Sequence, residues 1–133
     1  MSPEVFAARA EALTGAPFRL GGRDPATGLD CVGLVAAALG EGVGTPSGYR
    51  FRNSSIATHL GFATRAGFAP ATGPVARGDL ILARPGPAQH HLLVVLGRDR
   101  FVHAHAGLRP VALHLARLPW PLEAHWRLQS DKE

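Results

Sequence analysis

The sequence predicts an α+β domain with helices in its first half and an antiparallel sheet in its second half. Up to Gly67, apolar residues recur at the three- and four-residue spacing of amphipathic helices. From Leu80 onward they form short apolar runs separated by turns that contain glycine or proline, which is typical of strands. Helices followed by a series of hairpin-linked strands indicate the α+β class. The length of 133 residues fits one domain, and we expect residues 1–133 to form it.

Three segments of the first half are predicted to be helices. Residues 3–13 are amphipathic, and Gly15 follows them as a stop signal. Residues 31 to about 40 form an apolar run with Asp30 in place as the N-cap. A third helix begins near Ile56 and ends before residue 67. The segments rich in glycine and proline are expected to be loops or linkers: residues 21–28, 41–52 and 70–77.

The second half is predicted to contain five strands. Residues 80–84 form the first, and the proline-rich segment 85–87 turns the chain. Residues 91–96 are continuously apolar, which is typical of a buried central strand. The remaining strands are expected at residues 101–105, 111–115 and 124–128.

Composition excludes several classes of protein. A hydrophobic content of 46% with 18% charged residues indicates a globular protein rather than a disordered one. No apolar run approaches the ~20 residues that cross a bilayer, so we expect no membrane insertion. The net charge is +4, but the arginines are scattered and aromatic residues do not alternate with them, which argues against nucleic-acid binding. The N-terminus lacks the pattern of a secretory signal, so we expect the protein to be made in the cytoplasm.

Cys31 is the only cysteine, which excludes an intramolecular disulfide and a cysteine-based zinc cage. It lies in the first turn of a predicted helix, where unpaired backbone N–H groups and the helix dipole favour a thiolate. A lone cysteine is more often a small buried hydrophobic residue. Because histidines later in the chain could supply a base, we identify Cys31 as a candidate nucleophile.

His91 opens one predicted strand, and His103 lies in the next one across a tight turn. Neighbouring antiparallel strands can place two such side chains beside each other on one face. If the helix of Cys31 packs against that face, a thiol–imidazole–imidazole chain forms. His91 would then exchange a proton with the thiol, and His103 would hold the ring of His91 in its working tautomer. His105 shares the face of His103 and is the alternative third member.

Metal binding is the competing chemistry for these histidines. His91, His103 and His105 could supply three imidazole ligands to zinc. However, no carboxylate is arranged nearby to orient such ligands, and Cys31 would have no role. We therefore expect thiol chemistry without a metal or another cofactor.

The other polar and aromatic candidates are expected to have structural roles. Asp79 follows a glycine and is expected to fix the start of a strand through backbone hydrogen bonds. His90 is expected to be a solvated loop residue. We expect surface or packing roles for His59, His114 and His125, and core or cleft-wall positions for Trp120 and Trp126.

Five segments of the sequence form a recognisable set: Phe18-Arg-Leu-Gly-Gly22, Gly28-Leu-Asp-Cys-Val-Gly-Leu-Val35, Gly78-Asp-Leu-Ile-Leu82, His91-Leu-Leu-Val-Val-Leu-Gly97 and Phe101-Val-His-Ala104. Together they resemble the NlpC-type cysteine peptidases, over residues 5 to 128. The resemblance implies a papain-like α+β fold with Cys31 as nucleophile, His91 as base and His103 as the third, orienting residue. It also implies hydrolysis of amide bonds in the stem peptides of bacterial cell walls, without a cofactor.

The same resemblance assigns two residues to substrate binding. Asp30 matches an aspartate that helps to hold the free amino terminus of the stem peptide. Phe18 stands where the family usually has tyrosine, and Val32 stands where it usually has serine. Both changes remove a hydroxyl group near the substrate end of the cleft.

Wall hydrolases of this family usually carry a signal peptide and a wall-binding domain, and this sequence shows neither. A bare catalytic domain resembles the peptidases mounted on the tails of bacteriophages and phage-like gene transfer particles. We therefore expect tail-hub proteins as partners, a location on such a tail, and action on the periplasmic cell wall. Two alternatives stay open: a structural tail-hub protein with an unused or vestigial site, and an amidase or acyltransferase with the same trio and a non-wall substrate.

Overall fold

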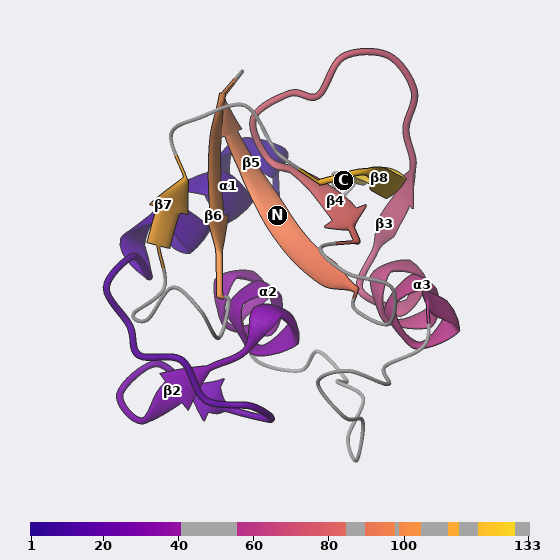
Figure 1. The fold of residues 1–133 in the computed structure, drawn as a ribbon. Coiled ribbons are helices and arrows are strands. Elements are labelled where there is room, and N and C mark those ends of the chain that lie inside the picture. The colour runs from indigo at the N-terminus through magenta and orange to yellow at the C-terminus, as the bar shows by residue number, and fades with distance from the viewer. Residues whose placement is uncertain (41–55, 85–89, 98, 105–111, 115–119, 130–133) are drawn as a thin grey trace.

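The computed structural model describes residues 1–40, 56–84, 90–97, 99–104, 112–114 and 120–129 (Figure 1). The helices within these ranges are α1 (Pro3–Ala12), α2 (Cys31–Leu39) and α3 (Ile56–Arg65). The strands are β1 (Arg23–Asp24), β2 (Gly28–Leu29), β3 (Phe68–Pro70), β4 (Asp79–Ala83), β5 (His91–Gly97), β6 (Arg100–His103), β7 (Ala112–His114) and β8 (Leu122–Leu128). None of the helices in the described part of the chain is both long and apolar enough to cross a bilayer.

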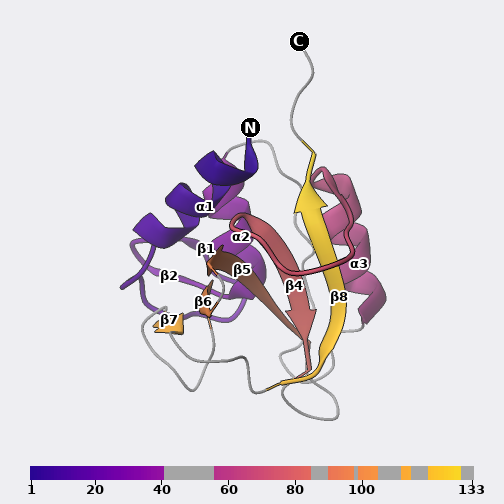
Figure 2. The same cartoon turned by 90° about the horizontal axis from the view of Figure 1, so that it is seen from above.

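Within the described residues, the main sheet has six antiparallel strands in the order β3-β8-β4-β5-β6-β7. The predicted α+β class, with helices before an antiparallel sheet, is therefore confirmed. The last strand, β8, lies in the interior of the sheet between β3 and β4 rather than beside the strand that precedes it. Figure 2 shows α1 and α2 beside β5, and α3 beside β8.

The structure contains short strands that the sequence did not predict. Residues 23–24 and 28–29 pair as a separate two-stranded sheet, although we expected a loop at 21–28. Residues 68–70 form β3, an edge strand that pairs with β8 and ends in a proline. Strands of two or three residues are too short to show a period, so the sequence could not reveal them. The predicted loop at 41–52 and the turn at 85–87 lie outside the described residues.

The two faces of the sheet have different coverings. Leu80 on β4 and Leu92 and Val94 on β5 are fully buried in the core that includes the helices. A second buried cluster occupies the opposite face, where Trp120 packs against it: Ile81, Ala83, Leu93, Val95 and Phe101. Side chains alternate along a strand. His91 and His103 therefore share the face of Leu93 and Phe101, opposite to the helices.

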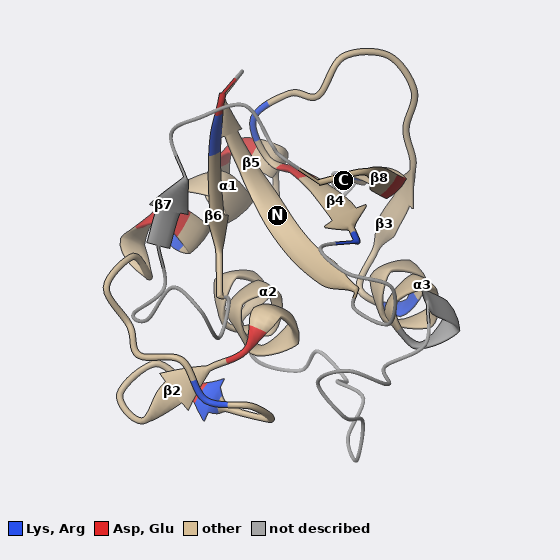
Figure 3. Cartoon of the chain, in the orientation of Figure 1, with Lys and Arg blue, Asp and Glu red and all other residues tan. Residues whose placement is uncertain are grey.

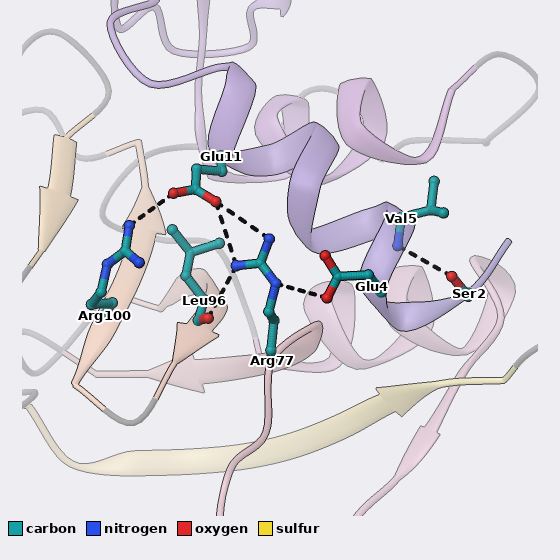
Figure 4. A network of polar contacts seen from close by, with 7 residues as sticks. All are labelled: Ser2, Glu4, Val5, Glu11, Arg77, Leu96 and Arg100. Carbon is teal, nitrogen blue, oxygen red and sulfur yellow. Dashed lines mark hydrogen bonds and ion pairs between the residues drawn. The ribbon is translucent and has the colours of Figure 1, made fainter.

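An ion-pair network joins α1 to the sheet (Figure 4). Arg77 donates from Nε to Oε1 of Glu4 at 2.9 Å, and from Nη1 to the carbonyl oxygen of Leu96 at 3.1 Å. Arg100, at the start of β6, donates from Nη2 to Oε2 of Glu11 at 2.8 Å. Because both glutamates lie on α1 and α1 packs on α2, this network also helps to fix the helix that begins with the cysteine.

Candidate active site

Asp30 fixes the start of α2 and ties a loop to it. Its Oδ1 accepts a hydrogen bond from the backbone N–H of Gly33 at 2.8 Å, which is the N-cap bond that the sequence predicts. The same oxygen accepts from Nη1 of Arg23 at 2.8 Å, and Oδ2 accepts from the N–H of Gly21 at 2.8 Å. The carboxylate is 2% exposed. These contacts hold the loop against the first turn of α2, and a substrate contact at Asp30 stays a prediction.

Cys31 is the first residue of α2, and its side chain reaches β5. The thiol group lies within reach of the backbone N–H groups of Leu92 on β5 and of Val32 on α2. Cys31 is only 7% exposed. The candidate nucleophile therefore meets the sheet one residue away from His91.

Burial raises the pKa of Cys31 to about 12, and the negative charge of Asp30 acts in the same direction. The N–H groups of Leu92 and Val32 and the positive charge of Arg23 lower this pKa by a smaller amount. The helix start therefore favours the thiolate, as expected, but burial of the sulfur outweighs this effect. Removing the sulfur from water disfavours the charged form more than the helix start favours it. At neutral pH the candidate nucleophile is therefore a neutral thiol.

Alkylation of Cys31 by iodoacetamide should therefore be at least ~100-fold slower at pH 8 than alkylation of a small thiol, because the thiolate is the reacting form. The rate should keep rising with pH until the protein unfolds. The control is the same protein in urea, whose cysteine should react like a free thiol with a pKa near ~8.5. A plateau of the native rate below pH 7 would instead indicate a stable thiolate paired with imidazolium.

His91 and His103 form a hydrogen-bonded imidazole pair. Nε2 of His91 lies 3.0 Å from Nδ1 of His103, and the ring planes are inclined at 87°. Val94 pairs with Val102, so the two histidines are diagonal neighbours on one face of adjacent strands. His91 is 4% exposed and His103 is fully buried. A neutral pair satisfies this geometry, because one ring donates and the other accepts.

The position of α2 differs from the expected one. The sequence argument makes the thiol–imidazole–imidazole chain conditional on the cysteine helix packing against the face that carries both histidines. In the structure α2 packs on the opposite face, with Leu92 and Val94, and only the thiol of its first residue approaches the start of β5. The physical reason is that the apolar residues of α2 need an apolar surface. The continuous apolar run of β5 offers one on both faces, so the sequence does not show which face the helix covers.

Trp120 lies beside the imidazole pair. Its ring centroid lies 5.9 Å from that of His91 and 5.9 Å from that of His103, with the ring planes nearly perpendicular in both cases. A cleft-wall or core position for Trp120 agrees with these contacts. His105, the alternative third member, lies outside the described residues, so the choice between His103 and His105 stays open.

His90 is not the solvated loop residue that we expected. Its Nδ1 lies 2.8 Å from Oε1 of Glu123, and its side chain is only 14% exposed. The ring of His59, which is 1% exposed, lies 6.0 Å from that of His90. His90 therefore belongs to a partly buried polar contact between the start of β5 and β8, and His59 has the packing role that we expected.

The two departures from the family pattern lie in different environments. Val32 is fully buried in the core, so it contributes to packing rather than to a surface that meets substrate. Phe18 forms an isolated bridge with Leu29 and packs partly buried against the core. A substrate contact at Phe18 stays a prediction. Among the described residues, no three or more His, Cys, Asp or Glu side chains are grouped so that they could hold a metal ion.

A second polar cluster around Asp79 was missed by the sequence argument. Asp79 is fully buried, and its Oδ2 accepts from the N–H of Ala76 at 2.9 Å, which is the predicted bond at the start of the strand. It also lies 2.6 Å from Nε2 of His125 and accepts from Nε of Arg127 at 2.8 Å. The alternation along β8 places His125 and Arg127 on one face, but only strand pairing shows that this face meets Asp79.

Solved structures with the same fold include three NlpC/P60 proteins. One, from Staphylococcus aureus subsp. aureus Mu50, is described as similar to a lipoprotein of the NLP/P60 family. It is 22% identical to this chain, with a TM-score of 0.64. The match covers 97% of this chain and 42% of that chain. NlpC2 from Trichomonas vaginalis is 18% identical, with a TM-score of 0.65 and coverage of 97% and 47%. The NlpC/p60 domain of the peptidoglycan hydrolase SagA is 21% identical, with a TM-score of 0.60 and coverage of 94% and 97%.

This chain thus spans less than half of the first two structures and nearly all of the third. At these identities the likeness shows the fold, and it confirms the papain-like NlpC-type architecture that the sequence resemblance implies. Comparison with curated protein sequences gives no significant match. The model of the NlpC/P60 family matches residues 15–114, which include both the start of α2 and the imidazole pair. The chain therefore belongs to the NlpC/P60 family.

Proposed function

We propose that this chain is a cysteine endopeptidase that hydrolyses amide bonds in the stem peptides of bacterial peptidoglycan. The observation that carries the proposal is the 3.0 Å contact between His91 Nε2 and His103 Nδ1. The residue after His91 is Leu92, whose backbone N–H lies within reach of the thiol of Cys31. Membership of the NlpC/P60 family and the fold shared with the domain of a peptidoglycan hydrolase support it.

In this proposal Cys31 is the nucleophile and His91 is the general base. His91 meets His103 through Nε2, so proton exchange with the thiol uses Nδ1. The sulfur attacks the amide carbon while its proton passes to His91, which forms a tetrahedral intermediate. His91 then protonates the leaving amine, and a thioester remains on Cys31. Water, deprotonated by His91, hydrolyses the thioester and restores the thiol.

His103 acts through His91 and not on the substrate. It is fully buried and holds the base through one hydrogen bond, which selects the tautomer and fixes the ring orientation. Because the resting thiol is neutral, proton transfer accompanies the attack instead of preceding it. A neutral imidazole pair is the form that can accept this proton.

The direct test is digestion of purified peptidoglycan by the wild type and by Cys31→Ala, with mass spectrometry of the released fragments. We expect new stem-peptide ends from the wild type only, and the fragments then name the cleaved bond. Circular dichroism should show that both proteins are folded. If a folded wild type releases nothing, the proposed substrate is wrong, and an amidase or acyltransferase reaction on a non-wall substrate becomes the better hypothesis.

Attachment to a phage-like tail stays a prediction. It implies that the protein co-purifies with tail-hub proteins and acts on the periplasmic wall from that assembly. If assembly is the only role, Cys31→Ala should leave both the complex and the infection or transfer process unchanged, whereas a wall peptidase should lose the process and keep the complex.

A further inference from the structure

The carboxylate of Asp30, directly before the candidate nucleophile, is enclosed by donors of the chain itself. Its Oδ1 accepts hydrogen bonds from the backbone N–H of Gly33 and from Nη1 of Arg23, each at 2.8 Å. Its Oδ2 accepts from the backbone N–H of Gly21 at 2.8 Å. The side chain of Asp30 is only 3% exposed. The negative charge therefore already has a cation beside it and lies out of contact with water.

The β1–β2 hairpin brings the guanidinium of Arg23 to this carboxylate. Arg23 pairs with Leu29 across the hairpin, and Leu29 directly precedes Asp30. Nη1 of Arg23 also donates to the carbonyl oxygen of Gly22 at 2.9 Å. In Figure 3 the blue segment of this hairpin lies close to the red segment at the start of α2. The pairing of neighbouring strands therefore places the cation at Asp30.

The loop also packs closely on the first turn of α2. A Cβ atom at Gly33 would collide with the carbonyl oxygen of Gly22, and a Cβ atom at Gly22 would collide with the carbonyl oxygen of Gly28. Gly21 has a φ of 74°, a backbone conformation that favours glycine. Close backbone contacts on both sides of Gly22 therefore hold the loop over the carboxylate.

A substrate ammonium could reach Asp30 only by displacing one of these donors. Charge-assisted hydrogen bonds are stronger than neutral ones, and a buried carboxylate that loses its cation is left uncompensated. The family pattern has two hydroxyl groups near this end of the cleft, and Phe18 and Val32 stand at those positions here. These features argue against a site that selects a positively charged amino terminus.

We propose that Arg23 is a specificity-determining residue that occupies Asp30, so that the enzyme accepts stem peptides whose amino end is acylated. The inference rests on the proposed function and names the substrate class of the same site. In intact peptidoglycan the amino end of the stem peptide is joined to the glycan by an amide bond. The enzyme therefore acts on the intact wall and does not depend on an earlier hydrolase that frees this amino end.

The test compares two synthetic stem peptides that differ only at the amino end, one free and one acetylated. We expect the wild type to cleave both with kcat/KM values within about threefold of each other. A site built to hold an ammonium discriminates more strongly, so a preference for the free peptide above ~10-fold overturns the proposal. Arg23→Gln removes the cation and keeps the carboxylate, so it should gain at least a ~5-fold preference for the free peptide.

Two further variants show whether the charge of Arg23 is responsible. Arg23→Lys keeps a cation and should retain the wild-type ratio of the two kcat/KM values. Arg19→Gln is the matched control, since it removes an exposed arginine of the same segment, and it should also leave the ratio unchanged. If Arg23→Gln does not fold, Arg23→Met takes its place with the same expected gain. An unchanged ratio in the folded variant without the cation overturns the proposal.

A binding measurement separates this proposal from the proposed function, because it needs no cleavage. The amide resonances of Gly21 and Gly33 are followed by nuclear magnetic resonance while L-alaninamide, a small free amine, is added. We expect no saturable shift in the wild type and a saturable shift in Arg23→Gln. A saturable shift in the wild type, or none in Arg23→Gln, overturns the proposal.

The two failures are therefore distinguishable. If neither peptide is cleaved but the amide shifts are as expected, the proposed substrate is refuted, whereas the exclusion of an ammonium from Asp30 by Arg23 is supported. If the wild type cleaves only the free peptide, the proposed function stands and the role of Arg23 is overturned.

Discussion

His91→Ala is expected to reduce the kcat of peptide hydrolysis at least ~1,000-fold, because the neutral thiol then has no group to accept its proton. The resting pKa of about 12 for Cys31 makes this loss severe, since the thiolate is scarce at neutral pH without a base. The measurement is the rate of release of stem-peptide fragments at fixed enzyme concentration. A variant that keeps a tenth of the wild-type rate would contradict the role of His91.

His90→Ala is the matched control for this experiment. His90 is the adjacent histidine, but its ring contacts Glu123 and not the imidazole pair. We expect a change in kcat of less than about threefold. His103→Ala should lower kcat at least ~10-fold, as expected for loss of the group that orients the base. A larger loss from His105→Ala would transfer the third role to His105.

Asp79→Asn is expected to lower the free energy of unfolding at pH 7 by about 2–3 kcal/mol, because a fully buried carboxylate accepts several strong hydrogen bonds. The amide keeps the shape of the side chain but loses its charge and half of its acceptor capacity. Urea unfolding followed by fluorescence measures the change. Asp24→Asn is the control: Asp24 is an exposed turn residue that accepts from the N–H of Ala26 at 2.9 Å, and an asparagine can make the same bond.

The pH dependence of this difference has a defined sign. Burial alone would raise the pKa of Asp79, but hydrogen bonds from Arg127, His125 and Ala76 outweigh it, so the pKa is lowered from its ordinary value of 3.8. A carboxylate with a lowered folded pKa stabilises the protein above its unfolded pKa and loses that effect as pH falls through the folded pKa. The difference between wild type and Asp79→Asn should therefore be full at pH 7 and shrink below about pH 4. A difference that stays constant down to pH 2 would contradict the charged role of Asp79.

The sequence by itself determined the features that depend on neighbouring residues. Asp30 predicts the start of α2 because an N-cap bond spans only three residues, and the structure has that bond. The apolar run of β5 and its tight connection to β6 predict that His91 and His103 lie on adjacent strands. The motifs around Cys31 and the two histidines predict the NlpC-type family, which the family match confirms.

The tertiary structure decided what depends on partners far apart in the chain. It places β8 between β3 and β4, and so brings Arg127 and His125 to Asp79. It also places α2 on the face opposite to the imidazoles and buries the thiol. Burial outweighs the effect of the helix start on the thiol, because desolvation depends on every element around the sulfur, whereas the effect of a helix start depends on one turn.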